Sequence, residues 1–464
     1  MESHDQVENP ITTPERAWPS TRIYPIIGLV TLTLIILWLW IPWEWAPVDD
    51  PGQVILLGRE IAQAGRIQGT VERFFQLYRG DVSGGVFRPA AWIYPVFVYQ
   101  LPIGLAHVVR LLMVIVAILG PLMYFRRMGA GSTRLWVTLL LIIAGASTLY
   151  QGLFLLSLQE LSGAAFIGLG LMVRRNPSRV VFWLVAALFK APFAWLLIGN
   201  AVFLWRKNQR RQAAVSGSLG FGVLVISALW TRSGGYSGGY NLDPLNPAMW
   251  ENFSRLVEPM NTLLLVSVVW WLIATNGRLQ RRSDWVIFLI GWAGYTLQMI
   301  PWGVTAYYMG PISYLFAIFI ASTLTDSPNL SKRQFAIGML MPIFVAFWLL
   351  RVTLNLGFDI NSVMVESRQC LAPLSGSNTV VSGSLLYVTS SPEGPLQIKG
   401  TVERNDPTWN GSVNLEGDQL SGFMNPDTTH YLVIGATQIP EGRVATEVCR
   451  GKSIAVYELA PQKN

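Results

Sequence analysis

Long apolar segments alternate with short polar segments along most of the chain. The first apolar segment covers residues 23–43, and others cover about 102–125, 135–155, 161–173, 180–205, 213–230, 260–275, 285–302, 306–324 and 335–356. Apolar segments of roughly 17–25 residues can cross a bilayer as helices. The pattern therefore predicts an α-helical polytopic membrane protein with about eleven transmembrane helices.

The apolar segment 180–205 is interrupted by the sequence Lys190-Ala191-Pro192. Proline breaks or kinks a helix, so we expect a hairpin of two short helices here, with one long kinked helix as the alternative. Only the hairpin puts all the basic loops on one side of the membrane, and the positive-inside rule assigns that side to the cytoplasm. The basic loops contain Arg126/Arg127, Arg174/Arg175, Arg206–Arg211, Arg278–Arg282 and Lys332/Arg333.

This topology places the N-terminal tail, residues 1–22, in the cytoplasm. It places the first loop (44–101), a Gly/Tyr-rich loop (231–259) and the C-terminal residues outside the cytoplasm. The expected location is a plasma or inner membrane crossed many times. Within the first loop, an interfacial helix is expected over 51–64, because Asp50-Pro51 suits an N-cap followed by a first helical residue.

The residues after about 356 differ in composition from those before. They carry more Asp and Glu than Lys and Arg, whereas the preceding part is net basic. Three segments, NTVVSGSLLYVTSS, LQIKGTVER and HYLVIGATQI, combine β-branched and aromatic residues with flanking turn formers. We therefore predict a transmembrane domain over 23–356 and a small β-rich extracytoplasmic domain over 357–464. Its Cys370 and Cys449 are expected to form a disulfide, with two separate buried thiols as the alternative.

Composition narrows the function classes. The chain is 52% hydrophobic and only 13% charged, with 19 Trp and a mean hydropathy of +0.40, whereas soluble domains carry about 25% charged residues. Because the basic residues gather in loops between apolar segments, a pI of 9.4 does not indicate nucleic-acid binding. With histidines only at positions 4, 107 and 430, neither a Ser/His/Asp hydrolase nor a zinc site is supported.

Two adjacent acids, Asp49 and Asp50, follow the first apolar segment. By themselves they could be a helix cap and a solvated loop residue. Other charges follow in the same loop, including Arg79, Asp81 and Arg88. Charges this close to a membrane tend to pair or to meet a polar ligand. An ion pair with Asp81 or Glu72 is the alternative to a ligand-binding role for Arg88.

The sequence here resembles GT-C glycosyltransferases. VDDPGQVILLGREIAQAG together with FRPAAW resembles the first extracytoplasmic loop of that superfamily, and Lys190 resembles the basic residue of its broken middle hairpin. VTAYYMGPISY resembles the entry of a late helix that often reads Arg-Tyr. Here Tyr307 and Tyr308 stand instead, so a phosphate-binding arginine is missing at that place. The resemblance covers about residues 23–356 in topology.

The resemblance implies an enzyme that transfers a hexosyl or pentosyl group from a polyprenyl-phosphate donor to an extracytoplasmic glycan, lipid or protein, usually with inversion. A first-loop carboxylate would be the general base. Asp50 is preferred, with Asp49 orienting the acceptor, and the reverse assignment stays open. No cofactor is required, and a Mg²⁺ or Mn²⁺ ion bridging both carboxylates is the alternative.

Cationic groups are needed near the departing lipid phosphate. Lys190 is the first candidate, because a lysine inside a membrane costs about 3 kcal/mol on insertion scales; snorkelling to the interface is its alternative. Arg88 and Arg79 are candidates because the planar guanidinium suits phosphate.

Several other residues are weaker candidates for substrate binding. His107 and Arg110 share one helix face and could meet phosphate or serve in packing, Glu160 is a reserve acid or a helix cap, and Tyr307 and Tyr308 could contact substrate. The rival function is a transporter or flippase for a lipid-linked or anionic substrate, which also uses broken helices. Charge concentrated in the first outer loop, and not near mid-membrane, favours the enzyme.

Overall fold

The computed structural model describes residues 23–44, 66–93, 101–147, 149, 153, 158–233, 247, 259–279, 284–300, 309–325, 331–383, 398–403, 406, 408–415, 428–434 and 445–460. The chain forms two compact units, Met1–Pro42 and Trp43–Asn464. The first contains one described helix, α1 (Ile23–Leu39). The interfacial helix predicted over 51–64 lies outside the described residues.

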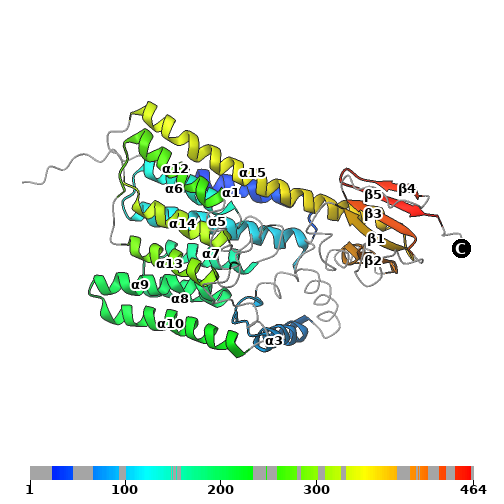
Figure 1. Cartoon of the computed structure of the whole chain (residues 1–464), viewed down its shortest axis with the longest axis horizontal. Coiled ribbons are helices and arrows are strands. Elements are labelled where there is room, and N and C mark those ends of the chain that lie inside the picture. The colour runs from blue at the N-terminus through cyan, green and yellow to red at the C-terminus, as the bar shows by residue number, and fades with distance from the viewer. Residues whose placement is uncertain are drawn as a thin grey trace, which may run out of the picture. The chain divides into compact units, whose positions relative to one another are not determined.

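The second unit is mainly helical (Figure 1). Its helices are α3 (Arg66–Gly84), α5 (Ile103–Arg127), α6 (Ser132–Gly145), α7 (Leu158–Met172), α8 (Asn176–Phe189), the short 3₁₀ helix η2 (Ala191–Phe193), α9 (Ala194–Arg206), α10 (Arg210–Ser233), α12 (Pro259–Thr275), α13 (Trp285–Met299), α14 (Met309–Thr323) and α15 (Lys332–Leu371). The expected fold class, a mostly helical protein with several apolar helices and a small C-terminal sheet, is confirmed, and the count of about eleven transmembrane helices stays a prediction.

The apolar helices fall into two groups by length. Ile103–Arg127, Arg210–Thr231 and Lys332–Leu371 are each long and apolar enough to cross a bilayer, and shorter apolar helices of 10–17 residues pack among them. Helices α5 and α7 touch at Gly120 and Gly168, where a Cβ on either glycine would overlap the backbone of the other helix. This close approach fixes α7 against the C-terminal half of α5.

The predicted hairpin around Lys190 is confirmed. The Asn200 amide nitrogen in α9 donates to the Asn176 side-chain oxygen at the start of α8, 3.3 Å away. In one straight helix these residues would lie about 36 Å apart at 1.5 Å per residue. Helix α8 therefore runs out to Lys190, and α9 returns alongside it (Figure 1).

Several basic loops meet at one end of this bundle, which we call the basic end. Arg127 at the end of α5 donates to the Leu171 carbonyl at the end of α7. Asn176 at the start of α8 donates to Gln212 at the start of α10 over 3.1 Å. Tyr124 of α5 reaches Asp284, just before α13, at 2.9 Å. Helices α8, α10 and α13 all begin at this end, so their C-termini gather at the other end.

The C-terminal domain is a five-stranded mixed sheet in the order β2-β1-β3-β5-β4. Its strands are β1 (Asn378–Gly383), β2 (Ser412–Leu415), β3 (His430–Ile434), β4 (Ala445–Arg450) and β5 (Ile454–Leu459). Strand β1 pairs parallel with β2 and β3, and β5 pairs antiparallel with β3 and β4. Strands β1 and β3 lie within two of the three predicted segments.

The third predicted strand segment, LQIKGTVER, is wrong where the structure describes it, because residues 398–403 are helical. Ile398 and Val402 are both fully buried in the domain core. Thr401 is fully buried as well. Side chains at i, i+3 and i+4 share one face of a helix, whereas in a strand of period two Thr401 would face away from Ile398 and Val402. The β-branched content of the segment outweighed this spacing in our prediction.

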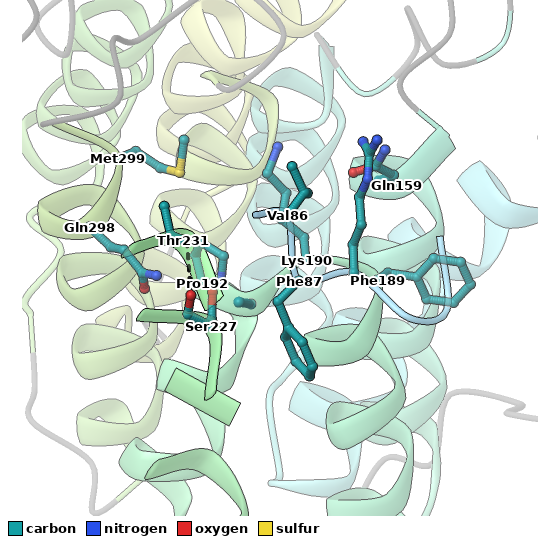
Figure 2. A pocket seen from close by; sticks show the side chains of 12 residues that line it. Val86, Phe87, Gln159, Phe189, Lys190, Pro192, Ser227, Thr231, Gln298 and Met299 are labelled. Atoms are coloured by element: carbon teal, nitrogen blue, oxygen red, sulfur yellow. Dashed lines mark hydrogen bonds between the residues drawn. The ribbon is translucent and has the colours of Figure 1, made fainter. Parts of the chain in front are cut away.

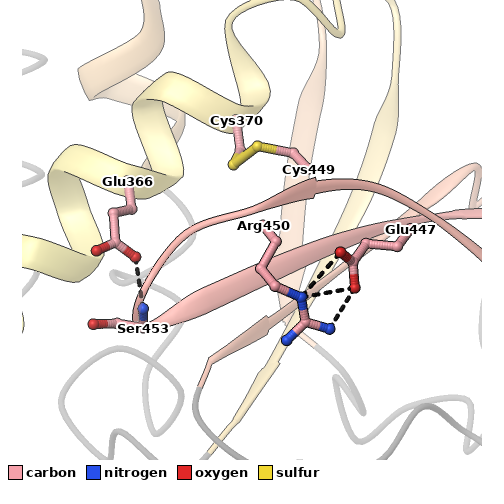
Figure 3. The surroundings of a disulfide bond; sticks show 6 residues. All are labelled: Glu366, Cys370, Glu447, Cys449, Arg450 and Ser453. Carbon is pink, nitrogen blue, oxygen red and sulfur yellow. Dashed lines mark hydrogen bonds and ion pairs between the residues drawn. A yellow bond between two sulfur atoms is a disulfide. The ribbon is translucent and has the colours of Figure 1, made fainter.

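Helix α15 continues past the expected end of the last span at residue 356 and reaches Leu371. Its final turns contribute Val363, Met364 and Leu371 to the core beneath the sheet. The predicted disulfide is present: Cys370 in α15 and Cys449 in β4 are bonded, with Cα atoms 5.6 Å apart (Figure 3). A cross-link that closes a loop of 79 residues stabilises the fold by roughly 4 kcal/mol in the chain-entropy treatment.

Candidate functional site

A cavity of about 680 Å³, counting the space that opens to solvent, lies at the end of the bundle opposite the basic end (Figure 2). Five parts of the chain form its walls: the segment after α3, the first turn of α7, the break between α8 and η2, the C-terminal turns of α10, and the C-terminal turn of α13. Its polar side chains are Arg88, Gln159, Lys190, Ser227, Thr231 and Gln298.

Lys190 reaches this cavity because the helix breaks there. The Lys190 backbone is extended, with φ −152° and ψ 114°, directly after α8 and two residues before Pro192. Its ammonium group forms an ion pair with Glu160 in the first turn of α7, where a carboxylate also suits the helix dipole. Both side chains are largely buried, with 12% and 4% of their surface exposed.

Arg88 stands on another side of the cavity and is also paired. Its guanidinium donates two hydrogen bonds of 2.8 Å to the two oxygens of Asp81 and lies 5.1 Å from the centre of the Trp92 ring. The Trp92 indole donates to the same carboxylate at 2.5 Å. The ion pair that the sequence left open as an alternative for Arg88 is therefore present, and Arg88 also lines the cavity.

The segment that carries Arg88 is fastened to the helices around the cavity. The Ala90 amide donates to the Leu188 carbonyl near the end of α8 at 3.1 Å. The Trp230 indole of α10 donates to the Val82 carbonyl at 3.1 Å, and its ring packs on Phe87. These contacts hold the guanidinium of Arg88 at the same cavity as the ammonium of Lys190.

His107 and Arg110 lie elsewhere. The His107 ring stacks on Trp43, with centroids 4.5 Å apart, and its Nδ1 is 3.0 Å from the Leu153 carbonyl. Arg110, which is fully buried, donates to the same carbonyl at 3.4 Å. His107 borders a smaller cavity of about 190 Å³ together with Trp43, Glu44 and residues of α15. Neither residue lines the cavity of Lys190 and Arg88.

The start of the first loop is held by α15. The Glu44 amide donates to the Asn361 side-chain oxygen at 2.9 Å, and the buried Glu44 carboxylate pairs with Arg368. Asp49 and Asp50 follow five and six residues later and lie outside the described residues, as do Tyr307 and Tyr308. Arg79 is exposed on α3 and does not line the cavity.

The uncharged polar residues of the cavity were not anticipated from the sequence. Gln298 lies near the end of an apolar helix, where a polar side chain is itself a signal for an internal site. Ser227 and Thr231 are four residues apart in α10, a spacing that puts them on one helix face. The described residues include no cluster of three or more His, Cys, Asp or Glu that could hold a metal ion.

No protein-family model matches the chain, and no curated protein matches it. Among solved structures, the chain is similar to ArnT from Cupriavidus metallidurans in the apo state, with a TM-score of 0.45 and 10% sequence identity. The match covers 94% of this chain and 98% of the ArnT chain. At this level the likeness concerns the course of the chain and transfers no residue role.

Proposed function

We propose that the chain is an integral membrane glycosyltransferase that moves a sugar from a polyprenyl-phosphate donor to an acceptor outside the cytoplasm. One observation carries the proposal: Arg88 and Lys190 share a cavity at the end of an apolar bundle opposite its basic end. A lipid phosphate at the membrane edge needs cationic groups of this kind, and its apolar tail can remain beside the helices.

The positions of the basic loops support an extracytoplasmic cavity. Arg127, Arg175 and Arg206 lie at or beside the ends of α5, α8 and α9 at the basic end. Under the positive-inside rule this end faces the cytoplasm. The cavity then opens on the other side, as transfer to an extracytoplasmic glycan, lipid or protein requires.

The reaction needs a base as well as cations. An acceptor hydroxyl is a weak nucleophile until a positioned group removes its proton. In our proposal Asp50 takes that proton, and the acceptor oxygen bonds to the anomeric carbon from the side opposite the phosphate. The bond from that carbon to the phosphate oxygen breaks, and its electron pair leaves with the phosphate. Asp49 orients the acceptor, and attack from the opposite face inverts the anomeric configuration.

Support for a base in the first loop comes from its anchored start. Glu44 is held on α15 through Asn361 and Arg368. Asp50 is six residues further along the sequence and lies outside the described residues.

The departing phosphate acquires negative charge as the bond breaks. Lys190 and Arg88 would stabilise that charge more strongly than the charge of the intact diester, and this difference is what lowers a barrier. In the structure both cations are paired with carboxylates, Lys190 with Glu160 and Arg88 with Asp81. Donor binding must therefore exchange at least part of these carboxylate contacts for phosphate contacts.

The proposal is tested by transfer of radiolabelled sugar from polyprenyl-phosphate pentoses and hexoses to a cell-envelope extract, using purified protein in vesicles. We expect Asp50→Asn to lower kcat by about 10²- to 10⁴-fold, the usual contribution of a general base, with donor binding retained. Asp359→Asn is the matched control, because Asp359 is exposed on α15.

Two results would contradict the proposal. One is full transfer by the double variant Asp49→Asn/Asp50→Asn. The other is movement of the intact lipid-linked sugar across the vesicle bilayer with no transfer product, which would favour the transporter.

A further inference from the structure

The cavity has walls of two chemical kinds. Arg88 and Lys190 are cations, each paired with a carboxylate. The walls from α10 and α13 contain Ser227, Thr231 and Gln298, which carry no charge. In Figure 2 Gln298 and Thr231 border the cavity on the same side of the view. Nothing in the proposed phosphate chemistry uses these three residues.

The orientation of the Gln298 amide is fixed by its one hydrogen bond among the described residues. The Trp195 indole nitrogen lies 3.0 Å from Gln298 Oε1. An indole N–H can only donate, so the atom that faces it must be the amide oxygen. The NH₂ group therefore points away from Trp195, and in Figure 2 it is turned toward Thr231 and Pro192.

Trp195 is itself held in place by the helix that carries Gln298. Gly294 lies one turn before Gln298 on α13, and a Cβ there would collide with the Trp195 ring. The ring can lie against the α13 backbone only because residue 294 is glycine. The indole that orients Gln298 is thus held in place by the packing of α9 on α13.

Thr231 supplies the complementary group. Its hydroxyl donates its proton to the Ser227 carbonyl at 2.8 Å. A hydroxyl has one proton and two acceptor lone pairs, so the oxygen of this cavity-lining residue can still accept a hydrogen bond. An amide donor and a hydroxyl acceptor that line one cavity match an alcohol, which accepts one hydrogen bond and donates another.

We propose that Gln298 and Thr231 form a subsite for a hydroxyl group of the donor sugar, with Gln298 as the specificity-determining residue. The inference rests on the proposed function and adds to it the part of the cavity that recognises the sugar. Neutral groups of this kind discriminate between hydroxyl patterns, because a substrate that lacks the matching hydroxyl leaves buried polar groups unpaired.

The test measures equilibrium binding of three probes to the full-length protein: a polyprenyl-phosphate hexose, a polyprenyl-phosphate pentose, and polyprenyl phosphate without sugar. We expect Gln298→Leu to weaken binding of at least one sugar-bearing lipid by about tenfold, the effect of losing a neutral hydrogen bond and leaving its partner unpaired. Affinity for polyprenyl phosphate should stay unchanged.

Thr231→Val is the second variant, because it keeps the shape and removes the acceptor; the same selective loss is expected. Gln369→Leu is the matched control, since Gln369 is exposed on α15. If Gln298→Leu and Thr231→Val change binding of all three lipids equally, or of none, the subsite is refuted while the proposed function stands. If the wild-type protein binds none of the three lipids, the proposed function fails with it.

Discussion

Cationic side chains have different partners at the two ends of the bundle. At the basic end, Arg127 and Arg179 donate to carbonyls in the last turn of α7, those of Leu171 and Gly170. Carbonyls in a last helical turn have no partner within their helix, so these arginines cap α7. At the cavity end, Arg88 and Lys190 instead meet carboxylates, and both face open space.

The difference indicates which cations can exchange partners. A carbonyl in a last helical turn loses a needed partner when its arginine leaves, and nothing replaces it. A cation that lines a cavity can exchange its carboxylate partner for a phosphate, which offers the cation an equal or larger negative charge. In the proposed function Lys190 and Arg88 are therefore the cations that would meet the ligand, whereas the basic-end arginines cap a helix.

The largest expected effect separates the two ends directly. Lys190→Met should weaken binding of polyprenyl phosphate by about 10- to 100-fold, because a hydrogen bond to a charged group contributes about 1.5–3 kcal/mol. Arg127→Met should leave that affinity unchanged and lower stability only. Both are measured as dissociation constants with the purified protein.

Lys190→Met also removes the cation that pairs with the buried Glu160 carboxylate, whose negative charge by itself would repel an anion. The double variant Lys190→Met/Glu160→Gln removes this effect. We expect it to regain stability while binding stays weak. If binding of the lipid phosphate returns in the double variant, Lys190 is not a phosphate contact.

A smaller effect of opposite sign is expected from Glu160→Gln alone. This change leaves the Lys190 ammonium without its neutralising carboxylate, so polyprenyl phosphate should bind several-fold more tightly, on the order of 1 kcal/mol. Product inhibition by polyprenyl phosphate should rise in proportion.

Glu72→Gln, on the exposed face of α3, is the control for a general loss of negative charge. Unchanged or weaker lipid binding by Glu160→Gln would show that Glu160 does not compete with the ligand. Pairing with a carboxylate would then not distinguish the cations of the cavity from those of the basic end.

Local pattern predicted much of the fold. The lengths of the apolar segments predicted the positions of most of the described helices. The requirement that all basic loops lie on one side of the membrane predicted the hairpin at Lys190. Local pattern did not place the end of α15, since residues such as Asp359 and Glu366 are too polar for a span yet remain helical. A signal near the end is Pro373, because helices usually end at or before the residue that precedes a proline, although Pro342 lies inside the same helix.

The site was only partly predictable. Lys190 and Arg88 stood out because charges near apolar segments are costly. Their environment did not, because Lys190 and Glu160 are 30 residues apart and meet only when α7 packs beside α8. Gln298 carries no charge, and its role depends on Trp195, 103 residues away. Such partners are set by tertiary packing and leave no local pattern.

The smallest expected effect tests whether the basic end is structural only. Tyr124 donates to Asp284, a buried carboxylate, at 2.9 Å. Tyr124→Phe removes that donor and should lower the free energy of unfolding by about 1–3 kcal/mol, measured by denaturation in detergent. Tyr457→Phe is the matched control, because the Tyr457 hydroxyl meets the exposed side chains of Arg450 and Glu447 and its loss should cost under about 0.5 kcal/mol. Both variants should bind polyprenyl phosphate like the wild type. Weaker lipid binding by Tyr124→Phe alone would show that the two ends are energetically coupled.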